Sequence, residues 1–162
     1  MLRTEQTNAG AARALLRGAT PTDLPAIERL LTESALPLDG VREALATFLL
    51  AESAGALVGV AGLEVCCEHA LLRSVAVTPA WRKRGLGREL VTRVIAQAEA
   101  RGIKGLYLLT NTAEHYFPSF GFETITREQV PDEVRQTSEF RGACPESATV
   151  MCRPLRHAAT TP

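Results

Sequence analysis

The sequence feature that most restricts the fold is a short basic turn between an apolar strand and a helix, written AWRKRGLGREL at residues 80–90. Residues 70–77 before it are apolar and strand-like, and apolar residues repeat every four positions from Leu86, which predicts a helix over residues 86–101. The start of a helix exposes backbone N–H groups with a partial positive charge, and glycines allow a ligand to approach that backbone. The turn is therefore either a solvated basic loop or a cradle for a phosphate.

Two common nucleotide motifs do not fit this turn. A Walker loop needs Gly-Lys followed by Ser or Thr, and the chain contains no such triplet. The dinucleotide fingerprint needs a third glycine after Gly85-x-Gly87, but Leu90 occupies that position. A phosphate at this turn requires another type of site.

The composition indicates one globular domain with no general affinity for nucleic acid. The chain has 162 residues, 46% of them hydrophobic, and its 18 basic and 18 acidic residues cancel. This balance argues against a nucleic-acid-binding protein and against a polybasic membrane protein. The longest apolar stretch, residues 55–65, is too short to span a membrane. We expect one domain over residues 13–155, with disordered tails at residues 1–12 and 156–162.

The four cysteines do not form a CxxC pair, so the sequence supports no metal site. We expect a reduced, cytoplasmic protein with free thiols. Cys66, Cys67 and Cys144 could instead bind trivalent arsenic, but their spacing gives no support, and idle thiols are the favoured interpretation.

The order of apolar patterns predicts an α/β (α+β) arrangement, with antiparallel hairpins early and a crossover at the long helix. Alternating or continuous apolar runs predict strands at residues 15–19, 47–53, 55–65, 70–77, 105–110, 121–125 and 147–155. Helical patterns occupy residues 20–34, 41–46, 86–101, 111–120 and the first part of 130–140.

The segment LLRSVAVTPAWRKRGLGREL resembles motif A of the GNAT family of N-acetyltransferases, whose signature here is Arg82-x-x-Gly85-x-Gly87 after a Val-x-Val strand end. LLTNTAEHYFPSFGF resembles their motif B, which closes with Gly121-Phe122. The resemblance covers residues 14–155. It implies a mixed, mostly antiparallel sheet of six or seven strands with a V-shaped splay, flanked by about four helices.

The same resemblance implies acetyl-coenzyme A as co-substrate, without a metal. In this family the pyrophosphate rests on the N–H groups of the turn, and the pantetheine arm pairs with the preceding strand, which splays from the strand near residues 108–110. The implied cofactor-binding residues are Val75, Ala76, Val77, Arg82, Lys83, Arg84, Gly85, Leu86, Gly87, Arg88, Thr110, Asn111 and Phe117.

Acetyl transfer needs a neutral amine, so a base must take a proton from the acceptor. Many family members use a glutamate on the fourth strand, which this sequence lacks, so we expect Glu64 on the neighbouring strand to act as base or to hold a water; the alternative is a solvent-facing glutamate. The family's usual acid is a tyrosine four residues before the closing glycine, where this chain has Phe117. Either the adjacent Tyr116 substitutes as the acid, or the thiolate leaves without one.

Arg73 is the candidate reader of a substrate carboxylate, with Ser74 beside it, because a guanidinium can bind a carboxylate through two hydrogen bonds. A salt-bridged strand arginine is the alternative. The C-terminal third, with Arg127, Val130-Pro131 and Cys144-Pro145, resembles bacterial N-acetyltransferases linked to arsenic resistance and the acetyltransferase domain of N-acetylglutamate synthase.

This likeness implies a small-molecule amine acceptor, either an amino acid or a glutamate-like compound that could contain arsenic. A non-catalytic acetyl-coenzyme A sensor and a protein N-acetyltransferase are the alternatives. No nucleic-acid or membrane partner is expected, and a homodimer is compatible with the family.

Overall fold

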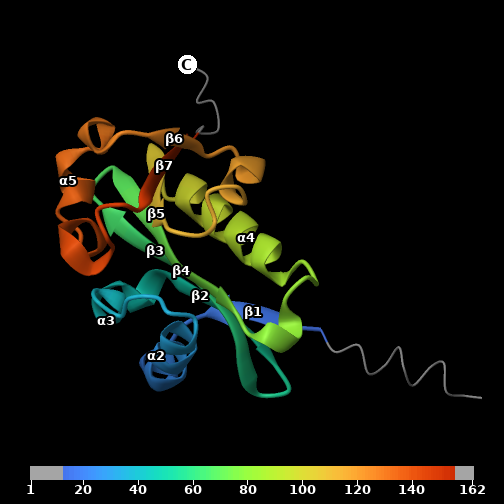
Figure 1. Ribbon diagram of the computed structural model, residues 1–162. Helices are drawn as coiled ribbons and strands as arrows, with labels where there is room; N and C mark the ends of the chain where they lie inside the picture. Colours follow the sequence, from blue (N-terminus) through green and yellow to red (C-terminus); the bar gives the residue numbers. More distant parts are fainter. Residues whose placement is uncertain (1–12, 156–162) are drawn as a thin grey trace, which may run out of the picture.

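Seven strands form one mixed sheet in the order β1-β2-β3-β4-β5-β7-β6, as seen in the computed structural model (Figure 1). The structure describes residues 13–155, so the two expected tails lie outside the described residues. The strands are β1 (Leu15–Gly18), β2 (Phe48–Ser53), β3 (Ala56–Cys66), β4 (His69–Val77), β5 (Gly105–Thr110), β6 (Glu123–Ile125) and β7 (Thr149–Pro154).

Helices cover both faces of the sheet (Figure 1). The α-helices are α2 (Leu24–Glu33), α3 (Val41–Ala44), α4 (Leu86–Ala100) and α5 (Asp132–Arg135), and shorter helical turns include η4 (Phe117–Phe120) and the π-helical turn η6 (Glu139–Ala143). Leu50 and Val60 pack with α2, whereas their strand neighbours Ala51 and Ala61 pack with α4, because successive strand residues face opposite sides. Within residues 13–155, no helix combines the length and apolarity needed to cross a bilayer.

The predicted α/β fold with a mixed sheet of six or seven strands is confirmed, with one local difference. Residues 111–120 were expected to form one short helix, but only η4 is helical there, because the preceding residues form a turn in which the Thr110 hydroxyl accepts the Ala113 N–H at 2.9 Å. The last strand, β7, for which the sequence predicted no position in the sheet, is inserted between β5 and β6.

The parallel strands β4 and β5 separate after three residue pairs. They pair only at His69↔Gly105, Ala70↔Leu106 and Leu71↔Tyr107. Beyond that point β4 stays paired with β3, and β5 stays paired with β7. The facing edges of β4 and β5 therefore have backbone groups without a strand partner, and the expected V-shaped splay is present.

A β-bulge re-aims the backbone of β4 inside this splay. Gly62 pairs with Arg73 and Val60 pairs with Ala76, so two residues of β4 oppose one residue of β3. Ser74 within the bulge has a φ of 59°, in the left-handed region that non-glycine residues seldom adopt. Bulges of this kind bend a strand and change the direction of its side chains next to functional sites.

We predict that Gly62→Ala destabilises the fold by about 1–3 kcal/mol. A Cβ at this position would overlap the ring of Phe48, which is 2% exposed and has no free space into which it can move. Urea denaturation measures the free energy of unfolding. Gly18→Ala is the matched control because a Cβ there meets no atom within 4 Å, and an equal effect of the two changes would contradict the prediction.

Candidate functional site

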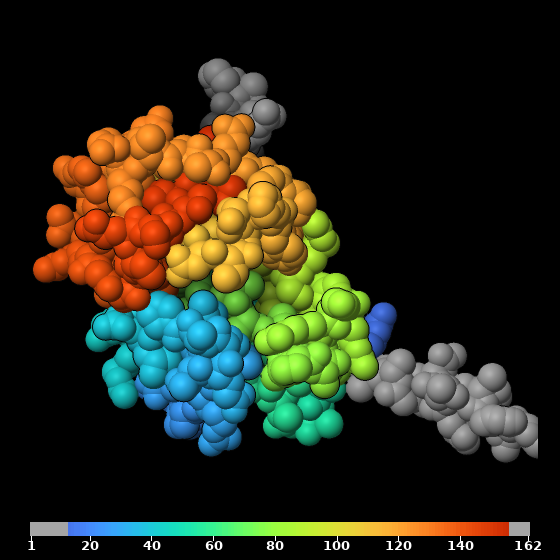
Figure 2. Space-filling model, in the orientation of Figure 1, coloured from blue at the N-terminus to red at the C-terminus, as the bar shows by residue number. Residues whose placement is uncertain are grey.

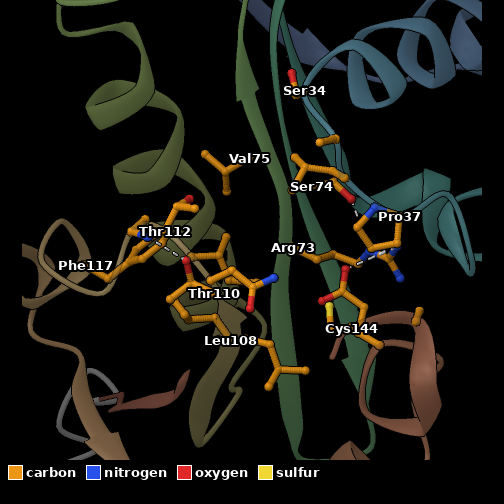
Figure 3. A pocket seen from close by; sticks show the side chains of 18 of the residues that line it. Ser34, Pro37, Arg73, Ser74, Val75, Leu108, Thr110, Thr112, Phe117 and Cys144 are labelled. Atoms are coloured by element: carbon orange, nitrogen blue, oxygen red, sulfur yellow. Dashed lines mark hydrogen bonds and ion pairs between the residues drawn. The ribbon is translucent and has the colours of Figure 1, made fainter. Parts of the chain in front are cut away.

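A cavity of about 570 Å³ occupies the gap where β4 and β5 splay apart. Figure 2 shows the surface hollowed where the blue-to-cyan segments of α2 and α3 meet the yellow and orange-red segments of the second half of the chain. In Figure 3, Thr110, Thr112 and Phe117 lie on one side of β4, with Arg73, Ser74 and Cys144 on the other. The lining residues are 34–37, 72–75, 108–113, Tyr116, Phe117, Glu139 and 143–145.

A second cavity, of about 290 Å³, lies at the basic turn and shares Tyr116 with the first. Lys83 and Gly85 both have positive φ, at 63° and 84°, which curls the turn immediately before the first residue of α4. The first N–H groups of a helix have no intrahelical partner and favour an anion. The Arg82 Nε donates to the Val77 carbonyl at 3.0 Å and ties the turn to the end of β4.

Most of the predicted cofactor-binding residues line these two cavities. The larger cavity is lined by Val75, Thr110, Asn111 and Phe117, and the smaller by Val77, Arg82, Lys83, Gly85, Gly87 and Arg88. Three predicted residues line neither. Leu86 and Ala76 are buried in the cores beneath α4 and α2, and the Arg84 guanidinium lies 4.9 Å from the centre of the Trp81 ring. A contribution of Leu86 or Ala76 to binding would come from the backbone.

Tyr116 lies where the two cavities meet. A Cβ added to Gly87, in the first turn of α4, would lie 3.4 Å from the Tyr116 hydroxyl oxygen. Burial raises the pKa of Tyr116, and nearby Arg88 offsets part of that rise, so the hydroxyl stays protonated at neutral pH. The neighbouring Phe117 is 7% exposed and its ring packs edge-on against Phe122 at 5.8 Å, consistent with a packing role.

Arg73 is the centre of a buried charged cluster. Its Nη1 donates to the Glu64 Oε1 at 2.9 Å, its Nη2 donates to the Asp39 carbonyl at 2.6 Å, and its Nε donates to the Ser74 hydroxyl at 3.2 Å. The same Nη2 lies 3.4 Å from the Glu139 Oε2, and the Arg73 side chain is 0% exposed. Each guanidinium nitrogen therefore already has a partner within the chain. In this conformation Arg73 is the salt-bridged strand arginine that was the alternative to a carboxylate-binding role.

The two carboxylates of this cluster differ in their relation to the larger cavity. Glu139 lines it, whereas Glu64, the predicted base, is not among its lining residues and faces Arg73 from β3. Sequence reasoning missed Glu139, because it lies in an irregular polar segment with no motif around it. Only the return of the C-terminal segment to the splay places it beside Arg73.

The cysteines are not arranged as a metal centre. Within residues 13–155, no three His, Cys, Asp or Glu side chains form a group that could hold a metal ion. Burial is the main cause that raises the pKa of Cys66 and of Cys144 to about 12, so both thiols are protonated at neutral pH. A protonated thiol is a poor nucleophile and a poor ligand for a soft ion.

Residues 44–124, half of the chain, match the acetyltransferase (GNAT) domain. The chain belongs to the GNAT acetyltransferase family. GNAT enzymes use acetyl-coenzyme A as the acetyl donor.

Sequence relatives of this GNAT domain include the amino-acid acetyltransferase of Ectopseudomonas mendocina, which is 32% identical over 125 residues. The match covers 72% of this chain and 29% of that protein, so the chain spans less than a third of its length. A second relative, the amino-acid acetyltransferase of Aeromonas salmonicida, is 33% identical, over 53% of this chain and 20% of that protein.

Solved structures with the same fold include the N-acetylglutamate synthase of Neisseria gonorrhoeae complexed with coenzyme A and N-acetyl-glutamate, at a TM-score of 0.77 and 24% identity. That match covers 89% of this chain and 35% of the synthase. Rv2747 of Mycobacterium tuberculosis, in complex with CoA, has a TM-score of 0.75 and 26% identity, and the match covers 88% of this GNAT domain and 99% of that chain.

Proposed function

We propose that this chain transfers the acetyl group of acetyl-coenzyme A to the amine of a small amino acid. The observation that carries the proposal is the contact, through Tyr116, between the cavity at the basic turn and the cavity in the splay. The first has the helix N-terminus and cations that a diphosphate needs, and the second has a buried guanidinium and a buried carboxylate.

The coenzyme is expected to follow the free edge of β4. Its diphosphate would rest on the N–H groups from residue 84 to residue 88, and its pantetheine arm would hydrogen-bond to the unpaired backbone near Val75 and Val77. This route directs the thioester toward the larger cavity. Glu64 contacts Arg73 but does not line the larger cavity, so a role for Glu64 as base would require a bridging water.

The acceptor is proposed to be a small amino acid for two reasons. Curated relatives are named amino-acid acetyltransferases, and the larger cavity has the volume of a small-ligand site rather than of a long groove. Arg73 remains our candidate for the carboxylate, with Ser74 beside it. In this proposal the substrate carboxylate takes over the contact of the Arg73 Nη2 with Glu139, which at 3.4 Å is the longest of the cluster, and Glu139 stays in the wall of the cavity.

Acceptor specificity is tested by incubating the protein with acetyl-coenzyme A and a panel of amines while free thiol release and product mass are followed. The panel holds the common amino acids, glutamate-like phosphinic and arsinic analogues, polyamines and a lysine peptide. Acetylation of one amino acid, or of an arsenic-containing glutamate analogue, supports the proposal. Coenzyme binding without turnover of any amine supports a sensor, and turnover of only the peptide supports a protein acetyltransferase.

Carboxylate recognition by Arg73 is tested without changing the protein. We predict that kcat/KM falls by about 100-fold or more when the preferred amino acid is replaced by its amide, because the guanidinium then loses a charged partner. Equal kcat/KM values for the amino acid and its amide would show that Arg73 does not recognise the substrate carboxylate. A homodimer and a cytoplasmic location remain predictions; light scattering of the same sample measures the oligomeric state.

A further inference from the structure

The wall of the larger cavity contains two charged side chains, Arg73 from β4 and Glu139 from η6. They come from elements that are 66 positions apart in the chain and meet only through the fold. Glu139 is 4% exposed, so it is as buried as the core side chains around it. Carboxylates are seldom buried this far without a full set of partners.

The two carboxylates in contact with Arg73 share a single positive charge, so one of their two negative charges is unmatched. Arg73 is the one cation of the cluster, and it is shared between Glu64 at 2.9 Å and Glu139 at 3.4 Å. The remaining groups that face Glu139 are the Cys144 thiol, which hydrogen-bonds to it, and the more distant Asp39 carboxylate. Neither supplies a positive charge, so the cluster complements a cation that enters from the cavity.

The burial of Glu139 also costs the fold stability. Burial raises the pKa of Glu139, while Arg73 and Cys144 lower it by less. A carboxyl group whose pKa is raised in the folded state favours folding at low pH, where it is protonated. That contribution is lost as the pH rises from the pKa of the group in the unfolded chain through its pKa in the folded protein. Costly carboxylates that line a cavity are typical of functional sites.

We propose that Glu139 binds the ammonium group of the acceptor and takes its proton before acetyl transfer. The inference rests on the proposed function. The ammonium gives one proton to the Glu139 carboxylate, and the neutral nitrogen attacks the thioester carbonyl. The C–N bond forms and the C–S bond breaks. The second amine proton supplies the proton of the coenzyme A thiol, either directly or by replacing one that the Tyr116 hydroxyl donates, and Glu139 then returns its proton to water.

Glu139 is better placed for this role than Glu64. Glu139 lines the cavity, and its contact with Arg73 is the longer of the two. Glu64 does not line the cavity, and its short contact with Arg73 commits one of its oxygens. The two glutamates therefore form a matched pair, in which each carboxylate contacts the same guanidinium but only Glu139 lines the larger cavity.

The experiment compares Glu139→Gln with Glu64→Gln in the full chain. For Glu139→Gln we expect kcat/KM for the amine to fall by about 100-fold or more at neutral pH, the range of general-base catalysis. Its activity should recover as the pH approaches the pKa of the amine, because solvent then removes the proton. Its coenzyme A affinity should stay within about twofold, and its melting temperature should equal or exceed that of the parent. Glu64→Gln should lose less than about tenfold.

Binding of L-glutamate and L-glutamine in the presence of coenzyme A, measured by calorimetry, separates the two hypotheses. If the parent binds these amines but releases no thiol, the proposed function fails, and loss of that binding in Glu139→Gln still supports the ammonium site. A Glu139→Gln protein that keeps parental binding or turnover overturns the inference. A larger loss in Glu64→Gln, or no recovery at high pH, also overturns it.

Discussion

Replacing Gly87 by Asp is expected to weaken coenzyme A binding by about 100-fold, or about 2.8 kcal/mol, because a carboxylate then faces the diphosphate. Gly87 lies in the first turn of α4 and lines the cavity at the basic turn. A side chain fits there, since an added Cβ meets only the Tyr116 hydroxyl at 3.4 Å and the Val77 side chain at 3.7 Å. A negative charge in the first turn also favours the helix itself, so the fold should not suffer.

Calorimetric titration with coenzyme A at two salt concentrations measures this effect. The difference between the parent and Gly87→Asp should shrink as salt rises, because screening weakens the repulsion. Gly18→Asp is the control, because a Cβ added there meets no atom within 4 Å and the residue lies on β1 and lines neither cavity. An unchanged affinity in Gly87→Asp would mean that the phosphates do not rest on this turn.

Tyr116→Phe is expected to lower kcat by about 100-fold with little change in coenzyme A affinity, if its hydroxyl protonates the leaving thiolate. The hydroxyl lies over the first turn of α4, at the junction of the two cavities through which the thioester would pass. The raised pKa of Tyr116 keeps it a proton donor across the neutral range. Steady-state kinetics with the preferred acceptor measure kcat, and CD spectroscopy checks the fold.

Phe117→Leu is the matched control for Tyr116→Phe. Phe117 occupies the family's usual acid position but packs among Phe120 and Phe122. Its truncation should therefore lower the free energy of unfolding, while kcat stays close to that of the parent. If Tyr116→Phe retains parental kcat, the thiolate leaves without a dedicated acid. A thiol pKa of about 8.5 makes that departure chemically feasible.

The strands, the long helix and the basic turn before it could be predicted from the sequence because local patterns produce them. Apolar residues at helical spacing predicted that α4 begins at Leu86. In the turn before it, Lys83 and Gly85 have the left-handed backbone conformation, which glycine adopts without strain. The expectation of a helix over residues 111–120 was wrong in extent, because the Thr110 hydroxyl accepts the Ala113 N–H and so competes with the helical backbone bonds.

The candidate site divides in the same way. The proposed cofactor side depends on one contiguous turn and the strand before it, and most of the residues that the sequence predicted there line the cavity at the turn. The acceptor side depends on Arg73, Glu64 and Glu139, which are contributed by β4, β3 and the C-terminal η6. The sequence predicted that Arg73 binds a substrate carboxylate, but it did not predict the ion pairs of Arg73 with Glu64 and Glu139, because no local pattern specifies them.

The sequence by itself determined the local elements, the GNAT signature and the basic, glycine-containing composition of the turn, since each depends on neighbouring residues. Only the tertiary structure decided that β7 lies between β5 and β6, and that the C-terminal segment closes over the splay. This insertion brings Glu139 to Arg73 across 66 positions of chain. Such contacts depend on which surfaces pack together in three dimensions. Apolar burial drives that packing, and because it depends on the area buried and not on direction, a local sequence pattern does not specify which distant segments meet.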